Sequence, residues 1–185
     1  LLGTKRPESA KEQLAKLIGM TMVKKKLASY ETKDRSPLAA LPYLTVSRLQ
    51  PDLDDPDEKK EEEMLHVVLT GPPGVGKTTV AKLLGQLFFE MGYLKSGHVV
   101  ETDRSELVGG YIGQTALLVR QKVEEAMGGV LFIDEVYALK RAGNSEADFG
   151  QEAIDTLCKL MDEYKGKFVV VAAGYPEETA VFIKS

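Results

Sequence analysis

The sequence predicts an α/β domain in which a parallel sheet is flanked by helices on both faces. From about residue 64, apolar segments of strand length alternate with amphipathic segments of helix length, a pattern that favours right-handed strand-helix-strand units. The segment VLFID (130–134) opens with four apolar residues, as expected for a strand buried on both sides of a parallel sheet. A glycine-rich segment, GPPGVGKT (71–78), joins the first of these strands to the first long helix.

The chain divides into three parts. Residues 1–31 are expected to be mainly helical, with one break at Ile18-Gly19. Residues 32–63 hold four prolines and an acidic run, and we expect them to form a linker or insertion. Residues 64–185 carry the alternating pattern and form the predicted core of the domain.

This core is expected to contain four buried strands with long helices between them. The strands are LHVVLT (65–70), GHVVET (97–102), VLFID (130–134) and KFVVVAAGY (167–175). The helices are KTTVAKLLGQLFFEMGYL (77–94), TALLVRQKVEEAMGG (115–129) and EADFGQEAIDTLCKLMDEYKG (146–166). The last of these helices carries the single cysteine, Cys158, on an apparently apolar face, which predicts a buried structural thiol.

Charge and composition exclude several functional classes. The net charge is −4, and the acidic run PDLDDPDEKKEEE (51–63) alone carries −6, which leaves +2 for the rest of the chain. This balance lacks a basic footprint, so nucleic acid is an unlikely partner, and the acidic run is most simply a solvated linker.

No window approaches the roughly 20 apolar residues of a membrane span, and the opening LLGTKRPESAKEQ is too polar for a signal peptide. A lone cysteine fits a reducing compartment, so we expect the cytoplasm, or the plastid stroma in a photosynthetic eukaryote.

The glycine-rich segment predicts a nucleotide-binding site. GPPGVGKT fits the pattern G-x-x-x-x-G-K-[ST], and its position between a strand and a helix is the context that identifies a P-loop. Its glycines let backbone N–H groups wrap phosphates at the positive end of the following helix. Lys77 can reach the β- and γ-phosphates, and the Thr78 hydroxyl can bind Mg²⁺. The predicted phosphate-binding residues are Pro73, Gly74, Val75, Gly76, Lys77, Thr78 and Thr79.

Two adjacent carboxylates predict the chemistry of this site. Asp134 ends the apolar strand 130–134, where it would hold Mg²⁺ directly or through water. Glu135 follows at once and can orient and deprotonate the attacking water, so Glu135 and Lys77 are the predicted catalytic residues. The acidic pair favours ATP hydrolysis over GTP signalling, and no N-K-x-D string supports guanine specificity.

Other conspicuous residues give weaker indications of function. His66 and His98 lie at strand starts without Cys or His partners, so neither suggests a metal site. DFG (148–150) lacks a kinase catalytic loop, and Asp148 suits a helix cap. The break at Ile18-Gly19 could lay the backbone and Ile18 against an adenine ring, or be a simple kink; the residues alone leave both open.

With these motifs in place, residues 65–178 resemble the AAA+ ATPases of the red-type rubisco activase and stage V sporulation protein K group. The resemblance is carried by GPPGVGKTTVAKLLG, GHVVETDRSELVGGYIGQT, AMGGVLFIDEVYAL, DFGQEAIDTL and VVVAAGYPEE. The segment LIGMTMVKKKL is similar to the group's adenine-side segment, which implies that Ile18 and Gly19 contact the adenine of ATP.

The resemblance also gives an interpretation of the loop LVGGYIGQT (107–115). From the residues alone, a turn whose tyrosine folds back onto the core is the simpler interpretation. In AAA+ ATPases an aromatic-hydrophobic-glycine triplet lines the pore of a ring, usually a hexamer, and here that triplet is Tyr111-Ile112-Gly113. The resemblance therefore implies a protein-remodelling motor that threads or tugs a client polypeptide, whose identity is open.

Three departures from the family's pattern matter. The segment 32–63 is longer and more acidic than usual, and the polar residue expected at the end of the fourth strand is not obvious, with Tyr175 nearest to that place. The arginine finger and the C-terminal helical lid would follow Ser185, so we expect this chain alone to be mostly monomeric and weakly active. The alternatives are a rubisco activase specifically, a nucleotide-dependent scaffold that threads nothing (a secretion-associated one, for example), and, disfavoured by charge, a nucleic-acid motor.

Overall fold

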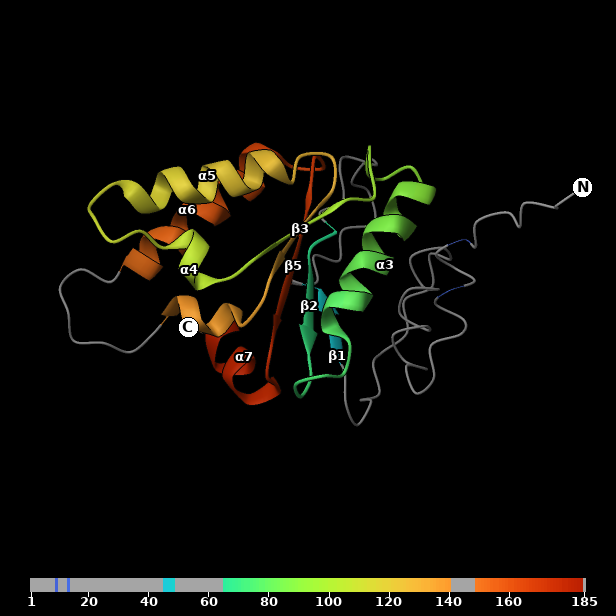
Figure 1. Ribbon diagram of the computed structural model, residues 1–185, viewed down its shortest axis with the longest axis horizontal. Coiled ribbons are helices and arrows are strands. Elements are labelled where there is room, and N and C mark those ends of the chain that lie inside the picture. The colour runs from blue at the N-terminus through green and yellow to red at the C-terminus, as the bar shows by residue number, and fades with distance from the viewer. Residues whose placement is uncertain (1–8, 10–12, 14–44, 49–64, 141–148, 185) are drawn as a thin grey trace, which may run out of the picture.

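The computed structural model describes residues 9, 13, 45–48, 65–140 and 149–184. The strands are β1 (Thr45–Arg48), β2 (Val67–Thr70), β3 (Val99–Thr102), β4 (Val130–Ile133) and β5 (Val169–Gly174). The helices are α3 (Lys77–Glu90), α4 (Arg104–Leu107), α5 (Gln114–Glu125), α6 (Phe149–Glu163) and α7 (Pro176–Ile183), and a 3₁₀ helix, η1, spans Val136–Lys140. Figure 1 shows α3 on one side of the sheet and α4, α5 and α6 on the other.

The strands form one sheet in the order β1-β2-β5-β4-β3. The pairs β2–β5, β5–β4 and β4–β3 are all parallel, so the predicted α/β class with a parallel sheet between helices is confirmed. Because these four strands run the same way, their carboxyl ends meet at one edge of the sheet. In open sheets of this kind, ligands bind at that edge.

The fifth strand was not expected from the sequence. β1 lies inside the segment predicted to be a linker, and it pairs antiparallel with β2, Thr45 opposite Thr70 and Arg48 opposite Val67. The strand is too short to show a clear alternation of polar and apolar residues, and prolines occur on both sides of it. It covers the outer edge of β2, whose backbone groups would otherwise be open to pairing with another chain.

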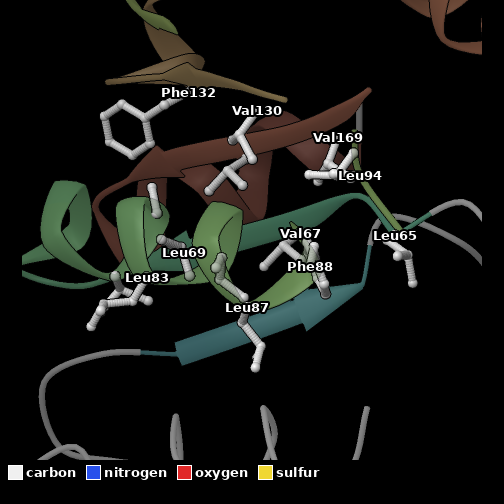
Figure 2. Close-up of a cluster of buried hydrophobic side chains, with 14 of the residues drawn as sticks. Leu65, Val67, Leu69, Leu83, Leu87, Phe88, Leu94, Val130, Phe132 and Val169 are labelled. Carbon is white, nitrogen blue, oxygen red and sulfur yellow. The ribbon is translucent and has the colours of Figure 1, made fainter. Parts of the chain in front are cut away.

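The face of the sheet toward α3 holds one of the two hydrophobic clusters. Figure 2 shows side chains of this cluster, to which strand residues such as Leu69 and Phe132 and α3 residues such as Leu83 and Phe88 belong. Phe88 is fully buried, so truncating it to alanine would cost about 3–5 kcal/mol of stability. This packing holds the long helix, and with it the loop before the helix, firmly against the sheet.

The opposite face of the sheet packs against α5, α6 and η1. Alternate strand residues point to this side, among them Val68, Leu131 and Val170, because successive side chains of a strand face opposite ways. On α6, the buried residues are Gly150, Ala153, Leu157 and Leu160. Cys158 is exposed, so the prediction of a buried thiol was wrong. It lies at the margin of the apolar stripe and not on the buried side.

His66, just before β2, is a buried histidine with one polar contact. Its ring is 3% exposed, and its Nδ1 accepts a hydrogen bond of 2.9 Å from the Val170 N–H. This bond places the ring proton on Nε2, which has no partner among the residues described. Burial lowers the pKa of His66 to about 4, although the Asp162 charge raises it in part. The imidazole is therefore neutral at pH 7.

We expect this buried imidazole to make the fold sensitive to mild acid. Because its pKa lies below the ordinary 6.5, the unfolded chain binds the proton more tightly, so stability is full above pH 6.5 and falls toward pH 4. The loss is about 2 kcal/mol at pH 5. The chain has two histidines, so NMR can follow both rings separately, with exposed His98 as the internal reference.

The matched variant is His66→Gln, whose side-chain oxygen can still accept from the Val170 N–H. Its unfolding free energy should lose about 2 kcal/mol less than that of the wild type between pH 7 and pH 5. A His66 ring that titrates near its ordinary pKa would contradict this account.

Candidate nucleotide-binding site

The loop between β2 and α3 has the backbone of a phosphate cradle. Gly74 and Gly76 have φ angles of +76° and +89°, the left-handed region that glycine adopts without strain. Gly76 is the N-cap of α3, and its carbonyl accepts from the Val80 N–H at 2.9 Å, which closes the first helical turn. The first N–H groups of the helix have no partner within the helix and point out of its positive end, where an anion binds.

This loop is attached to the sheet at its start and to the α3-side core farther along. The Gly71 N–H donates to the Gly174 carbonyl at 3.1 Å, which continues the β2–β5 pairing by one residue. Val75 packs its side chain against the α3-side core, leaving its backbone for the cradle. Thr78 is partly buried in the first turn of α3, while Pro73 and Thr79 are exposed.

Lys77 lies folded over the loop it belongs to. Its Nζ donates to the Gly71 carbonyl at 3.0 Å and to the Pro72 carbonyl at 3.2 Å. The same atom lies 5.4 Å from the centroid of the Tyr175 ring, within the range of a cation–π contact. The only cation that the sequence places in the P-loop is thus held at the edge where the parallel strands end.

Asp134 follows β4 at this same edge. Its N–H donates to the Thr102 carbonyl at 2.9 Å, and one of its carboxylate oxygens accepts the Glu135 N–H at 2.9 Å. Because β4 is separated from β2 only by β5, the carboxylate is two strands from the P-loop. Lys77, Thr78, Asp134 and Glu135 are therefore all brought to one edge of the sheet.

Glu135 has an unusual backbone. Its φ is +46°, and no other non-glycine residue in the described part of the chain has a positive φ. Residues other than glycine rarely adopt this backbone conformation, and residues that are strained in this way cluster at functional sites. The side chain is exposed, and the 3₁₀ helix η1 begins at the next residue. The turn directs Glu135 away from the core, where a carboxylate can meet solvent and substrate.

Two tyrosines complete this edge, and the sequence only hinted at them. The rings of Tyr137 and Tyr175 lie 5.8 Å apart, tilted by 31°. Burial, together with the nearby Glu135 charge, raises the pKa of Tyr137 to about 12, so the phenol stays protonated. Gly174 leaves the room that the Tyr137 ring occupies, since a Cβ there would lie 2.9 Å from a ring carbon. The signal in the sequence is the order Gly-Tyr-Pro at the end of the last strand, which contains Tyr175.

The loop from residue 108 to residue 113 presents an apolar tip to solvent. Tyr111 is 79% exposed and Ile112 is 93% exposed, so the tyrosine does not fold back onto the core. Gly113, with φ +79°, is the N-cap of α5. A large exposed apolar tip is a feature of an interaction site more than of a simple turn.

Some predicted residues lie outside this description. Ile18 and Gly19 fall in a segment that the structure does not describe, and so does Asp148 of the DFG string.

Within the described residues, no group of three or more His, Cys, Asp or Glu could hold a metal. No helix of the described chain is long and apolar enough to cross a bilayer.

The fold and the site together define a P-loop nucleotide-binding domain. The model of the ATPase family associated with various cellular activities (AAA) matches residues 67–179, and the chain belongs to this family. The family's name describes ATPases, which agrees with the arrangement of P-loop, Asp134 and Glu135.

The chain is similar to several curated proteins. It is 50% identical over 125 residues to stage V sporulation protein K of Bacillus subtilis (strain 168), covering 68% of this chain and 38% of that protein. It is 41% identical over 169 residues to a CfxQ homolog of Cyanidium caldarium, covering 91% and 54% of the two chains. It is 40% identical over 169 residues to the chloroplastic ribulose bisphosphate carboxylase/oxygenase activase of Cyanidioschyzon merolae, covering 91% and 53%. The predicted resemblance to this group is confirmed, and the chain spans about half the length of these relatives or less.

Proposed function

We propose that this chain is the ATP-binding and ATP-hydrolysing domain of a ring-forming motor that remodels a client polypeptide. The observation that carries the proposal is the convergence of the P-loop, Asp134 and strained Glu135 on one edge of the sheet. Backbone N–H groups of residues 74–79 bind the phosphates of ATP, and Lys77 turns from the loop carbonyls toward the β- and γ-phosphates. Ile18 and Gly19 remain the proposed contacts of the adenine.

The chain's side chains divide the chemistry of hydrolysis between them. Glu135 accepts a proton from the water whose oxygen attacks the γ-phosphorus, and ADP leaves through its β-phosphate oxygen. Thr78 and Asp134 would hold Mg²⁺, which supplies positive charge to the phosphates when bound. Two tyrosines border this region. Tyr137 stays protonated and so adds no negative charge, and the ring of Tyr175 contacts the Lys77 ammonium.

The loop 108–113, hereafter the client loop, supports the motor half of the proposal. Tyr111 and Ile112 offer apolar surface without charge or a fixed pattern of hydrogen-bonding groups, which suits a grip on an extended polypeptide of any sequence. Several copies in a ring, which we propose to be a hexamer, would bring such loops together. The names of the relatives link this group to rubisco activation in a plastid and to sporulation in a bacterium, so we propose a protein client in the cytoplasm or the plastid stroma.

Lys77→Ala is the direct test of nucleotide binding. Removing one charge-assisted contact with phosphate should weaken ATP affinity by about 10- to 100-fold. Titration calorimetry measures the affinity, and circular dichroism checks that the fold persists. The matched control is Lys82→Ala, which removes an exposed lysine of α3 that pairs with Glu101 and should leave the affinity unchanged. Equal ATP affinity in the wild type and the Lys77 variant would refute the P-loop assignment.

A further inference from the structure

We infer that Arg104 is a positioning residue that couples the client loop to the catalytic segment around Glu135. The inference rests on the proposed function and adds to it the route by which one site influences the other. Coupling between two sites needs a physical connection whose arrangement both sites can bias. The contacts of Arg104 form such a connection within the described residues.

On the catalytic side, Arg104 holds the 3₁₀ helix that follows Glu135. Its Nη1 donates to the Ala138 carbonyl at 2.8 Å and to the Leu139 carbonyl at 2.6 Å. The Ala138 N–H in turn donates to the Glu135 carbonyl at 2.7 Å. The guanidinium is partly buried, and a charged donor on carbonyls is a strong form of hydrogen bond. A movement of Glu135 is therefore transmitted to Arg104 through two short links.

On the client side, Arg104 is the first residue of α4, which leads directly into the client loop. Its carbonyl accepts the Val108 N–H at 2.9 Å, and the Asp103 side chain caps the helix by accepting the Ser105 N–H at 2.7 Å. Leu107, at the other end of α4, is 1% exposed. Such a short, capped and anchored helix moves as one piece with Arg104.

The client loop is itself fixed to α5. The Gly109 N–H donates to the buried Thr115 hydroxyl and the Gly110 N–H to the Gln114 side chain, each at 3.1 Å. A salt bridge of 3.0 Å between Lys122 and Glu106 joins α5 to α4. The loop thus spans two helices, and a displacement of α4 against α5 changes how its tip is presented.

Arginine is the residue that this position needs. Both hydrogen bonds come from Nη1, which stands one bond farther from the backbone than the ammonium nitrogen of lysine does, so a lysine at this position would fall short of the two carbonyls. The direct test is therefore Arg104→Lys, which keeps the charge and shortens the reach. The matched control is Arg120→Lys, which makes the same change at an exposed arginine on α5.

The experiment measures how a slowly hydrolysed ATP analogue changes the affinity of the whole protein for fluorescein-labelled casein, used as an unfolded polypeptide. In the wild type and in Arg120→Lys, the analogue should change the casein affinity by about fivefold or more. In Arg104→Lys, the change should fall below about twofold, with the analogue itself still bound. A ratio that is the same in Arg104→Lys as in the wild type, or a wild-type ratio of one, would overturn the inference.

Additional measurements distinguish a failure of the coupling from a failure of the proposed function. If the wild type binds no analogue, or casein binding is the same in Tyr111→Ala, the proposed function fails before coupling is tested. Amide hydrogen exchange on the wild type needs no variant at Arg104. Peptides that contain Gly109 and Gly110 should change their exchange rate when the analogue binds, and unchanged exchange there would also contradict the coupling.

Discussion

Glu135→Gln should lower kcat for ATP hydrolysis by about 10²- to 10⁴-fold, the usual contribution of a positioned general base. Glutamine keeps the size and much of the hydrogen bonding of the side chain but cannot accept the proton of the attacking water. ATP binding should persist, because the phosphate cradle lies on the other loop, between β2 and α3. In the whole protein, ATP that is bound and not hydrolysed should favour the assembled ring.

The measurement is steady-state turnover beside ATP affinity from calorimetry, with ring assembly followed by sedimentation. Glu124→Gln is the matched control, because it removes the same charge from an exposed residue of α5 and should leave turnover unchanged. A Glu135 variant that turns over at nearly the wild-type rate would remove this residue from the catalytic role.

Tyr111→Ala should abolish remodelling of the client and any stimulation of turnover by the client. The side chain is 79% exposed and makes its area available to a partner, so truncating it should weaken client binding by about 30-fold or more. The melting temperature should stay close to that of the wild type, because a side chain so exposed contributes little to the core. ATP affinity should also stay nearly unchanged, because the residue lies outside both phosphate motifs.

Two further variants sharpen this test. Tyr111→Phe should retain much of the function, since grip depends on ring area more than on the hydroxyl. Leu117→Ala removes another exposed apolar side chain, 68% exposed on α5 and outside the client loop, and should leave remodelling intact. Normal remodelling by Tyr111→Ala, or a clear drop in its melting temperature, would end the client-loop interpretation.

Much of this domain could be predicted because the signals are local. The P-loop string specifies its own backbone, and a run such as VLFI can be satisfied only at the centre of a sheet covered on both faces. Once the strands are parallel, the position of Asp134 beside the P-loop follows from topology alone. The family resemblance then gave an interpretation of Tyr111 that residue types by themselves did not favour.

The features that escaped prediction depend on neighbours distant in sequence. β1 forms because its backbone can pair with the outer edge of β2, and nothing in its own four residues indicates that this pairing is available. Cys158 shares an apolar run with Leu157 and Leu160, but the angle between successive helix residues turns its side chain to the surface. The contacts of Arg104 could not be predicted, because its two carbonyl partners lie more than 30 residues later in the chain.

The left-handed backbone of Glu135 affects which substitutions at this position a selection for stability would favour. Glycine would occupy that conformation more easily than glutamate by about 1 kcal/mol, and asparagine also tolerates it. Substitution there would thus be rewarded by any selection that acts on folding alone. On the catalytic role proposed for Glu135, a screen for heat resistance alone would favour a more stable chain that binds nucleotide without hydrolysing it. Selection for hydrolysis would then be the force that keeps a glutamate in this backbone conformation.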